Sequence, residues 1–442
     1  MPDKTFYLLS LGCAKNTVDS DSMAALLYGD GYAPVDKPGR ADVLIVNTCG
    51  FIQPAREESL KMLRKLAKNK KNGQVLIAAG CLTERYRQQI AEQVSGIDGI
   101  LGTRRWMDIL DVIHAVRPGQ PHPLYHLPET PTIGLDEHGV LRASIQGGSA
   151  YLKIADGCRR PCAFCAIPLI KGTAVSRPVS AILDEARQLQ KMDIQELILI
   201  AQDTTDYGHD LGVKDGLAKL LEQLVQAAPE IPWIRILYAY PGYVTDSLIE
   251  VMANNHQILP YLDIPLQHAH PDVLRRMKRP ADVEWVYRTL AKMRRAIPNL
   301  ALRTTFIVGY PGETEAEFQT LMDFISEIKF DHVGVFPFSF ELGTASESLG
   351  DPIPDEVKNE RTARLMELQE SISLAKNQTL VGKTLDILIE GNDKDISIGR
   401  SYRDAPEIDG LTIIEGQAPV GKIVKTRITG AMVHDLSGQL VE

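Results

Sequence analysis

The chain has 442 residues, of which 44% are hydrophobic and 24% are charged, the balance of an ordinary soluble globular protein. This composition excludes disordered, collagen-like and coiled-coil chains, and the length suggests about three domains. The net charge of −9 argues against a general nucleic-acid binder, which would carry a basic face. No apolar run approaches the ~20 residues that a membrane-spanning helix needs.

The N-terminal region is predicted to form a doubly wound α/β domain with a parallel sheet. Three apolar runs, each ending in a cysteine, are typical of strands buried on both faces; they lie at residues 6–13, 43–49 and 75–81. Helix-forming stretches lie between them, at about residues 20–30 and 54–70. Ligands of such sheets bind beyond the carboxyl ends of the strands, so the three cysteines can converge on one point.

The first strand candidate also bears a faint likeness to an export signal. Residues 6–13 resemble a lipoprotein cleavage box, but the apolar region is short and Lys4 is its only basic lead. We therefore expect a cytoplasmic protein with no membrane partner.

Residues 117–148 are predicted to be a linker. Their composition shifts toward proline and ends in two glycines, as is typical of a linker or crossover. The residues that carry this signal are Pro118, Pro121, Pro123, Pro128, Pro131, Gly147 and Gly148.

Six strand candidates alternate with helices from residue 149 onward. The strands are expected at 151–155, 196–201, 233–238, 261–264, 302–308 and 332–336, with helices in between, for example at 180–192, 215–228, 246–254, 283–296 and 315–328. Six repeats are too few for an eight-fold barrel and favour an open (β/α)6 barrel. The three remaining cysteines follow the first strand, at the carboxyl end where the chemistry of such barrels takes place.

The three cysteines of the barrel form the motif C-x3-C-x2-C at Cys158, Cys162 and Cys165. Disulfides are typical of small secreted chains, and a structural zinc site wants a fourth Cys or a close His, which the sequence lacks. Three thiolates can instead hold three corners of a [4Fe-4S] cluster, which leaves the fourth iron open for a small molecule. The convergence of Cys13, Cys49 and Cys81 suggests a second such cluster.

The C-x3-C-x2-C motif, with Phe164 before its last cysteine, resembles that of the radical S-adenosylmethionine (SAM) superfamily. The resemblance implies that the open iron chelates SAM, whose cleavage gives a 5′-deoxyadenosyl radical that abstracts hydrogen from an unactivated carbon. It also implies that Ile307 and Gly309 contact the adenine, while Gln202 and Gln267 are polar SAM candidates. A tight turn alone would also explain Gly309.

The C-terminal region is expected to form a small closed antiparallel β-barrel of five short strands with Gly-rich turns. The strands are predicted at 384–389, 396–401, 411–415, 422–429 and 431–440. The barrel resembles the TRAM module of RNA-modifying enzymes. From Lys376 onward, however, eight Lys and Arg face ten Asp and Glu, whereas an RNA-gripping barrel should be basic.

Taken together, these parts resemble the methylthiotransferase family of radical SAM enzymes. The predicted domains are an N-terminal three-Cys domain at 1–116, the linker at 117–148, a radical SAM core at 149–376 and TRAM at 377–442. The resemblance implies two [4Fe-4S] clusters and SAM as cofactors, with the cluster on Cys13, Cys49 and Cys81 holding or donating the sulfur. An electron donor and a sulfur source are implied as further partners.

Two branches of this family act on different substrates: an adenosine base of transfer RNA, and an aspartate of small-subunit ribosomal protein twelve. Residues 10–20, 263–269 and 399–410 resemble the second branch, which implies conversion of the aspartate to its 3-methylthio derivative. Because ribosomal proteins are basic, the acidic side chains of Asp404, Glu407 and Asp409 are predicted to dock the substrate. No residue stands out as a general acid or base.

Two alternatives remain open from the sequence. A transfer-RNA adenosine methylthiotransferase is the nearer one, although the acidic barrel disfavours an RNA substrate. A non-enzymatic iron–sulfur scaffold or redox sensor is more distant, and it would release no deoxyadenosine from SAM and a reductant.

Overall fold

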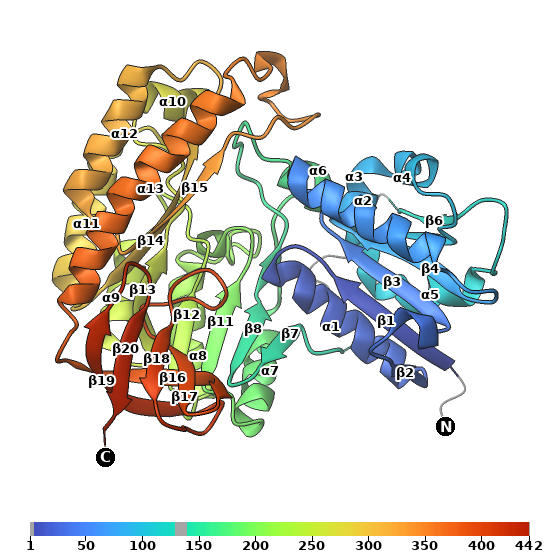
Figure 1. Ribbon diagram of the computed structural model, residues 1–442, viewed down its shortest axis with the longest axis horizontal. Helices are drawn as coiled ribbons and strands as arrows, with labels where there is room; N and C mark the ends of the chain where they lie inside the picture. The colour runs from blue at the N-terminus through green and yellow to red at the C-terminus, as the bar shows by residue number, and fades with distance from the viewer. Residues whose placement is uncertain (1–3, 129–138, 442) are drawn as a thin grey trace. The chain divides into compact units, whose positions relative to one another are not determined.

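The computed structural model describes residues 4–128 and 139–441, which fold into two compact units (Figure 1). Unit 1 consists of the chain up to Ser144 together with Leu152–Pro178 and Ser339–Glu347, and unit 2 consists of Ile145–Tyr151, Val179–Phe338 and Ser348–Glu442. All six cysteines therefore belong to unit 1. This division cuts across the four segments expected from sequence composition, whose boundaries stay a prediction.

Unit 1 contains a six-stranded parallel sheet in the order β2-β1-β3-β4-β5-β6. Its strands are β1 (Lys4–Ser10), β2 (Tyr32–Pro34), β3 (Val43–Thr48), β4 (Val75–Gly80), β5 (Gly99–Gly102) and β6 (Leu124–His126). The three predicted strands are β1, β3 and β4, which lie side by side in the sheet. The short strands β2, β5 and β6 were not predicted.

Helices cover both faces of this sheet, which confirms the doubly wound fold. They are α1 (Ala14–Gly29), α2 (Gln53–Lys68), α3 (Cys81–Tyr86), α4 (Gln88–Gln93) and α5 (Ile109–Ala115). Side chains alternate across a strand, so Ile45 of β3 packs with α1 and α5, while Leu44 packs with α2, α3 and α4. Both faces are buried, and this is why the first four residues of β3 are all apolar.

Unit 1 also holds the segment that carries the second set of cysteines. The short antiparallel pair β9 (Ala155–Asp156) and β10 (Val175–Ser176) encloses helix α6 (Ile167–Lys171). The predicted linker contributes strand β6 to the first sheet and strand β7 to the second; its residues 129–138 lie outside the described part of the chain.

The second sheet has seven strands in the order β15-β14-β13-β12-β11-β8-β7 and does not close. Its strands are β7 (Ala143–Gln146), β8 (Ser149–Lys153), β11 (Glu196–Ile200), β12 (Trp233–Ile236), β13 (Ile258–Asp263), β14 (Ala301–Val308) and β15 (His332–Pro337). Strands β11 to β15 pair in parallel, each with the next. The six predicted strands and the open barrel are thereby confirmed, and β7 is an additional edge strand.

Helices follow the strands of unit 2 as the sequence predicts (Figure 1). They are α7 (Val179–Lys191), α8 (Gly216–Ala227), α9 (Asp246–Asn254), α10 (Pro271–Arg276), α11 (Val283–Ala296), α12 (Glu315–Ile328) and α13 (Asp355–Gln378). Phe306 of β14 meets Phe324 of α12 and Phe330 edge to face, with ring centroids 6.5 and 6.1 Å away. Such aromatic pairs add about 0.5–1.5 kcal/mol each beyond their buried area.

The C-terminal strands form a closed five-stranded barrel in the order β16-β17-β18-β20-β19, as predicted, except that β18 and β20 pair in parallel and not antiparallel. They are β16 (Thr384–Asp393), β17 (Ile396–Ser401), β18 (Thr412–Glu415), β19 (Ile423–Ala431) and β20 (Leu436–Leu440). A small core of Ile387, Ile389, Ile414 and Ala418 fills the barrel.

Residues 400–409 of this barrel contact the open sheet of unit 2 through buried charges. The guanidinium of Arg400 donates to Glu196 of β11 at 2.6 Å and to the hydroxyl of Ser149 at 3.0 Å. Arg235 of β12 donates to the same carboxylate at 2.6 Å and to the carbonyl oxygen of Tyr402 at 2.9 Å. Residues 400–409 therefore connect the C-terminal barrel to the open sheet within unit 2.

This arrangement corrects the predicted docking surface. Asp404 is only 6% exposed, and the buried carboxylate of Asp409 accepts hydrogen bonds from Tyr261 at 2.7 Å and from Arg303 at 3.2 Å. The prediction that Asp404 and Asp409 dock a substrate is wrong, because both acids face partners inside unit 2. Only Glu407 is exposed.

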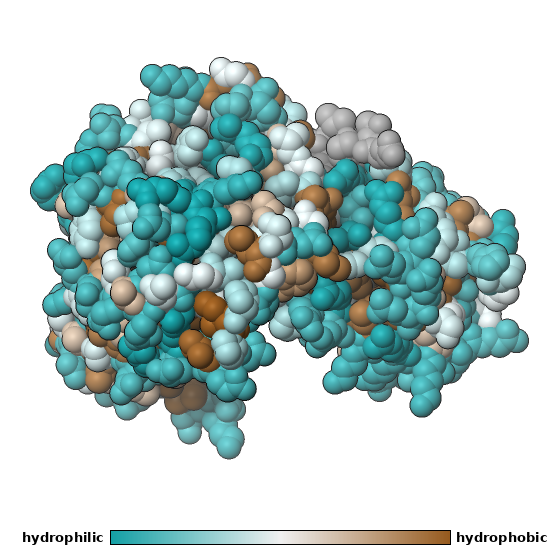
Figure 2. Space-filling model, turned by 90° about the horizontal axis from the view of Figure 1, so that it is seen from above, coloured by the Kyte–Doolittle hydropathy of each residue, from teal (hydrophilic) through white to brown (hydrophobic). Residues whose placement is uncertain are grey.

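The face of the molecule seen in Figure 2 is mostly hydrophilic and carries small apolar patches. Across the described part of the chain, no helix has the length and apolar character needed to cross a membrane.

The contacts of Asp409 generate a stability prediction. Asp409→Asn removes a charged acceptor from Arg303 and Tyr261, so the free energy of unfolding should fall by about 1.5–3 kcal/mol, the worth of hydrogen bonds to charged groups. Glu407→Gln, two residues earlier and exposed, should change it by less than about 0.5 kcal/mol. Thermal unfolding of the two variants measures the difference. Equal midpoints would show that the contacts of Asp409 do not hold the loop.

Candidate metal centre

Cys13, Cys49 and Cys81 follow three adjacent strands at the same edge of the first sheet. Cys49 comes directly after β3, Cys81 directly after β4, and Cys13 lies three residues after β1 and precedes helix α1. A Cβ atom placed on Gly12 would lie 3.1 Å from the sulfur of Cys49, so the loop that carries Cys13 lies against Cys49. The structure thus brings together three thiols that are distant in the sequence.

The ionisation of these thiols is linked. Burial raises the pKa of Cys81 to about 12; Lys171 lowers this pKa, whereas Cys13 and Cys49 raise it. Burial also raises the pKa of Cys49. Cys49 and Cys81 therefore resist losing their protons, and a bound metal cluster would offset this resistance, because metal binding releases the protons of its ligands. The donor set fits an iron–sulfur cluster held by three thiolates.

Polar side chains hold the backbone around this first set of cysteines. Asn16 donates to the carbonyl oxygens of Leu11 at 2.7 Å and Asn47 at 3.2 Å, and the amide of Asn47 donates back to the carbonyl oxygen of Asn16 at 2.9 Å. The hydroxyl of Ser59 accepts from the amide of Cys49 and donates to its carbonyl oxygen, both at 3.0 Å. None of these residues was predicted from the sequence, although an asparagine lies near Cys13 and another near Cys49.

Two glycines let the ends of β3 and β4 approach each other. A Cβ atom on Gly50 would lie 2.6 Å from the Cα atom of Leu82, and Gly80 has a φ of +104°, where its Cβ atom would meet the carbonyl oxygen of Thr48 at 2.5 Å. Any larger residue would separate Cys49 from Cys81.

Cys158, Cys162 and Cys165 lie in one tight loop between β9 and α6. The amide of Cys158 donates to the carbonyl oxygen of Gly172 at 3.0 Å. The amides of Arg160 and Ile167 donate to the sulfurs of Cys158 at 3.4 Å and Cys165 at 3.5 Å. Hydrogen bonds to sulfur stabilise thiolates and tune iron–sulfur clusters. None of the six cysteines forms a disulfide, and Phe164 is half-buried within the loop.

The other SAM candidates lie in unit 2, at the carboxyl ends of its strands. Gln202 follows β11, and Gln267 follows β13 with a φ of +75°. The amide of Gln267 donates to the carbonyl oxygen of Thr305 at 2.8 Å, and the amide of Ile307 donates to that of Gln267 at 2.9 Å. The structure therefore brings Gln267 to Ile307, with Gly309 one residue beyond the end of β14, while Gln202 follows a different strand.

Glu313 holds the turn that contains Gly309. Its carboxylate accepts from the amides of Gly309 at 2.9 Å and Tyr310 at 3.3 Å, and from Arg361 of α13 at 2.8 Å. Burial raises the pKa of Glu313 to about 7, although Arg361 and the two amides oppose this rise. A Cβ atom on Gly309 would lie 2.4 Å from Lys358, and its φ is +71°, so the turn by itself requires glycine here.

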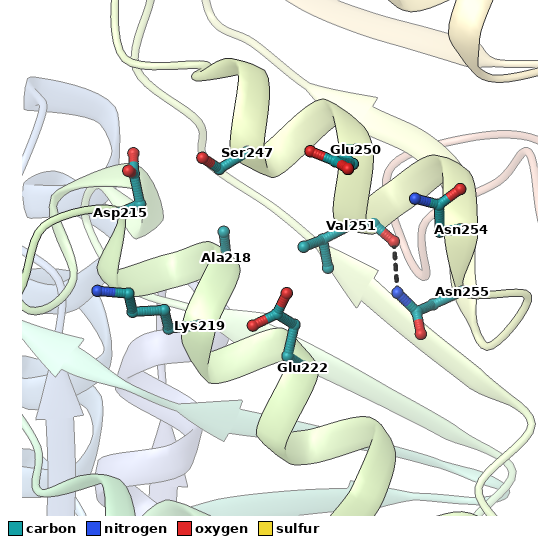
Figure 3. Close-up of a pocket in the computed structure, with 9 residues that line it drawn as sticks. All are labelled: Asp215, Ala218, Lys219, Glu222, Ser247, Glu250, Val251, Asn254 and Asn255. Carbon is teal, nitrogen blue, oxygen red and sulfur yellow. Dashed lines mark hydrogen bonds between the residues drawn. The ribbon is translucent and has the colours of Figure 1, made fainter.

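Two further polar clusters in unit 2 do not resemble active sites. A cavity of about 310 Å³ between α8 and α9 is lined by Asp215, Ala218, Lys219, Glu222, Ser247, Glu250, Val251, Asn254 and Asn255 (Figure 3). None of the residues that line it is a cysteine, and none is one of the predicted site residues. His270, Asp272 and Glu317 have ligand atoms within 4.8 Å of one another, but Glu317 already accepts from Arg276 at 3.0 Å and from the amide of Thr314 at 2.7 Å.

Models of three protein families match the chain. Residues 5–102 match the Uncharacterized protein family UPF0004, residues 152–325 match the Radical SAM superfamily, and residues 381–441 match the TRAM domain. Each match falls within one of the three predicted domains.

Relatives over the full length decide the family. The ribosomal protein uS12 methylthiotransferase RimO of Chloroflexus aurantiacus is 46% identical over 451 residues, covering 98% of this chain and 99% of the relative. The protein of the same name from Roseiflexus sp. is 44% identical over 459 residues, covering 99% and 97%. The chain belongs to the RimO family of methylthiotransferases. This membership confirms the predicted enzyme class and rejects the scaffold or redox sensor.

Solved structures agree with this radical SAM fold. The radical SAM methyltransferase TsrM from Kitasatospora setae, solved with cobalamin and a [4Fe-4S] cluster, has a TM-score of 0.57 at 11% identity. The match covers 87% of this methylthiotransferase and 80% of TsrM. At this identity the likeness concerns the fold alone.

The two sets of cysteines generate a prediction of metal content. Anaerobic reconstitution with iron and sulfide should load about eight irons per chain, four on each set of three thiolates. Replacing Cys158, Cys162 and Cys165 by Ala should leave about half of this iron. Replacing Cys13, Cys49 and Cys81 by Ala should also leave about half. Iron and acid-labile sulfide analysis measures both. A wild-type chain that reconstitutes only one cluster would contradict convergence of the strand-end cysteines.

Proposed function

We propose that this chain methylthiolates an aspartate of the small-subunit ribosomal protein uS12, replacing a C–H bond at its β-carbon by C–S–CH3. One observation carries the proposal: two sets of three thiols, each without a fourth cysteine, lie in the same compact unit. Substrate identity rests on the names of relatives that match the chain from end to end.

The six cysteines are the ligands in this proposal. Cys158, Cys162 and Cys165 hold the [4Fe-4S] cluster that chelates SAM, and the strand-end cysteines hold the second cluster. When bound, the first cluster supplies the electron that cleaves SAM, and the second supplies an iron on which sulfur is held. The backbone amides that donate to the sulfurs of Cys158 and Cys165 orient the first set.

SAM contacts are proposed for Phe164 in the cysteine loop and for four residues at strand ends of unit 2. Gln267, Ile307 and Gly309 lie at the end of β14, where the bonds from Glu313 fix the turn. Gln202 follows β11 and would supply a polar contact.

A radical route suits the residues around the cysteines. The β-carbon of aspartate is not acidic enough for a general base at neutral pH, and Lys171, the cation near Cys81, has a raised pKa because Asp156 and Asp19 outweigh its burial. This lysine stays protonated and cannot accept a proton. The reaction adds sulfur and a methyl group and removes hydrogen, so it needs an electron donor and a sulfur source besides SAM.

The substrate side of the proposal depends on charge. A chain with a net charge of −9 attracts a basic ribosomal protein and repels RNA. This favours uS12 over transfer RNA. An enzyme that acts on a ribosomal protein would work in the cytoplasm, where ribosomal proteins are made. Since Asp404 and Asp409 are buried, the attraction comes from other acids on the surface.

Mass spectrometry of ribosomal proteins tests the proposed substrate. uS12 from cells with the gene should carry one added methylthio group on an aspartate, and uS12 from cells without it should not. Methylthioadenosine in transfer RNA serves as the second readout. Loss of that nucleoside with unchanged uS12 would establish the alternative substrate.

Replacing Cys13, Cys49 and Cys81 by Ala should separate the two halves of the chemistry. SAM cleavage to 5′-deoxyadenosine should persist, because the set that chelates SAM is intact, whereas methylthio product should vanish. The matched variant lacking Cys158, Cys162 and Cys165 should lose both activities. Methylthio product from the first variant would show that its missing cysteines are structural.

A further inference from the structure

A network of buried charges lies inside unit 1. Asp19 of α1 accepts from Lys153 at 2.5 Å and from Lys171 at 3.1 Å, and both ammonium groups also donate to Asp156 of β9, at 3.2 Å each. Arg142 donates to Asp19 at 2.8 Å. All five side chains are at most 3% exposed. Two carboxylates are thus bound by three cations.

The network joins the two segments that carry the cysteines. Asp19 lies on the helix that begins directly after Cys13, while Asp156 lies two residues before Cys158. Lys171 ends helix α6, and the carbonyl oxygen of the next residue, Gly172, accepts from the amide of Cys158 at 3.0 Å. Each segment is therefore tied to the other through charged atoms.

Lys171 also lies near the first set of thiols. Helix α6 packs against helix α3, which begins at Cys81, and the positive charge of Lys171 acts on that thiol. Arg104, which follows β5, donates to the carbonyl oxygens of Ile170 at 2.8 Å and Leu169 at 2.9 Å. The end of α6 is held in place next to Cys81 by these bonds.

Stability alone does not explain why these charges are buried. Apolar residues of similar volume often replace a buried ion pair with no loss of stability, or with a gain. At one side of the network, Lys171 lies near a set of thiols that become anionic ligands. Adding an electron to a thiolate-bound cluster increases its negative charge, so a nearby buried cation favours the reduced form and a nearby carboxylate disfavours it.

We propose that Lys171, held by Asp19 and Asp156, is a positioning residue that raises the reduction potential of the cluster on Cys13, Cys49 and Cys81. The inference rests on the proposed function, because it needs a cluster at those cysteines. It extends that function by assigning a role to charged residues that bind neither iron nor substrate.

The test measures the potential of this cluster alone. The full-length chain with Cys158, Cys162 and Cys165 changed to Ala is reconstituted with iron and sulfide, and its reduction is followed by electron paramagnetic resonance in a redox titration. In that background, Lys171→Met should lower the ratio of reduced to oxidised cluster about tenfold at a fixed potential, a shift of ~59 mV for one electron. Lys171→Arg keeps the charge and should restore the starting value.

Asp19→Asn supplies the deciding comparison. It breaks the same ion pair as Lys171→Met but removes a negative charge, so the potential should shift in the opposite direction. A purely structural role would move both variants in the same direction, and that result would overturn the inference, as would an unchanged potential in both. If Lys171→Met does not fold, the sign of the shift in Asp19→Asn decides alone.

A control variant tests whether any lost ion pair in unit 1 has this effect. Lys70 lies two residues beyond the carboxyl end of helix α2 and binds Asp98 at 2.6 Å. Lys70→Met should leave the reduction potential of the cluster unchanged. An equal shift in this control would overturn the inference. Failure of the background chain to bind iron would instead overturn the proposed cluster at Cys13, Cys49 and Cys81.

Discussion

A site built from three thiolates tolerates little movement of its ligands, because each thiolate must reach the same cluster at a bond length of about 2.3 Å, as thiolate–metal bonds require. Unit 1 meets this constraint by placing its cysteines at the ends of buried strands. Strands β1, β3 and β4 are adjacent and parallel, so their carboxyl ends form one edge. The rest of unit 1 keeps that edge fixed.

Three kinds of contact keep the edge formed by the ends of β1, β3 and β4 fixed. Glycines at positions 50 and 80 allow β3 and β4 to lie close together where they end. The paired amides of Asn16 and Asn47 tie the loop of Cys13 to the next strand. The ion network of Asp19 and Lys171 then connects this edge to the loop of the second set. Both sets of ligands consequently belong to one packed body, although one belongs by sequence to the radical SAM domain.

Much of the fold could be predicted from the sequence because its strands are long, apolar and regularly spaced. The strands missed in unit 1 have only three or four residues each, such as β5 with the sequence Gly-Ile-Leu-Gly, too few to show a clear strand pattern. The cysteines could be found because their spacing and strand-end positions are local features. The burial of Asp409 could not be predicted from the sequence, since its partners Arg303 and Tyr261 lie 106 and 148 residues away. Lys153, a charged residue that ends the mostly apolar strand β8, was the visible sign of the ion network.

The central claim is that two clusters lie on the two sets of cysteines, and X-ray diffraction at the iron absorption edge tests it most directly. Crystals of the anaerobically reconstituted chain should show two peaks of anomalous density. One should lie beyond the ends of β1, β3 and β4, next to Cys13, Cys49 and Cys81, and the other within the loop of Cys158, Cys162 and Cys165. A single peak at the second set, with thiols at the strand ends and no iron, would contradict the account.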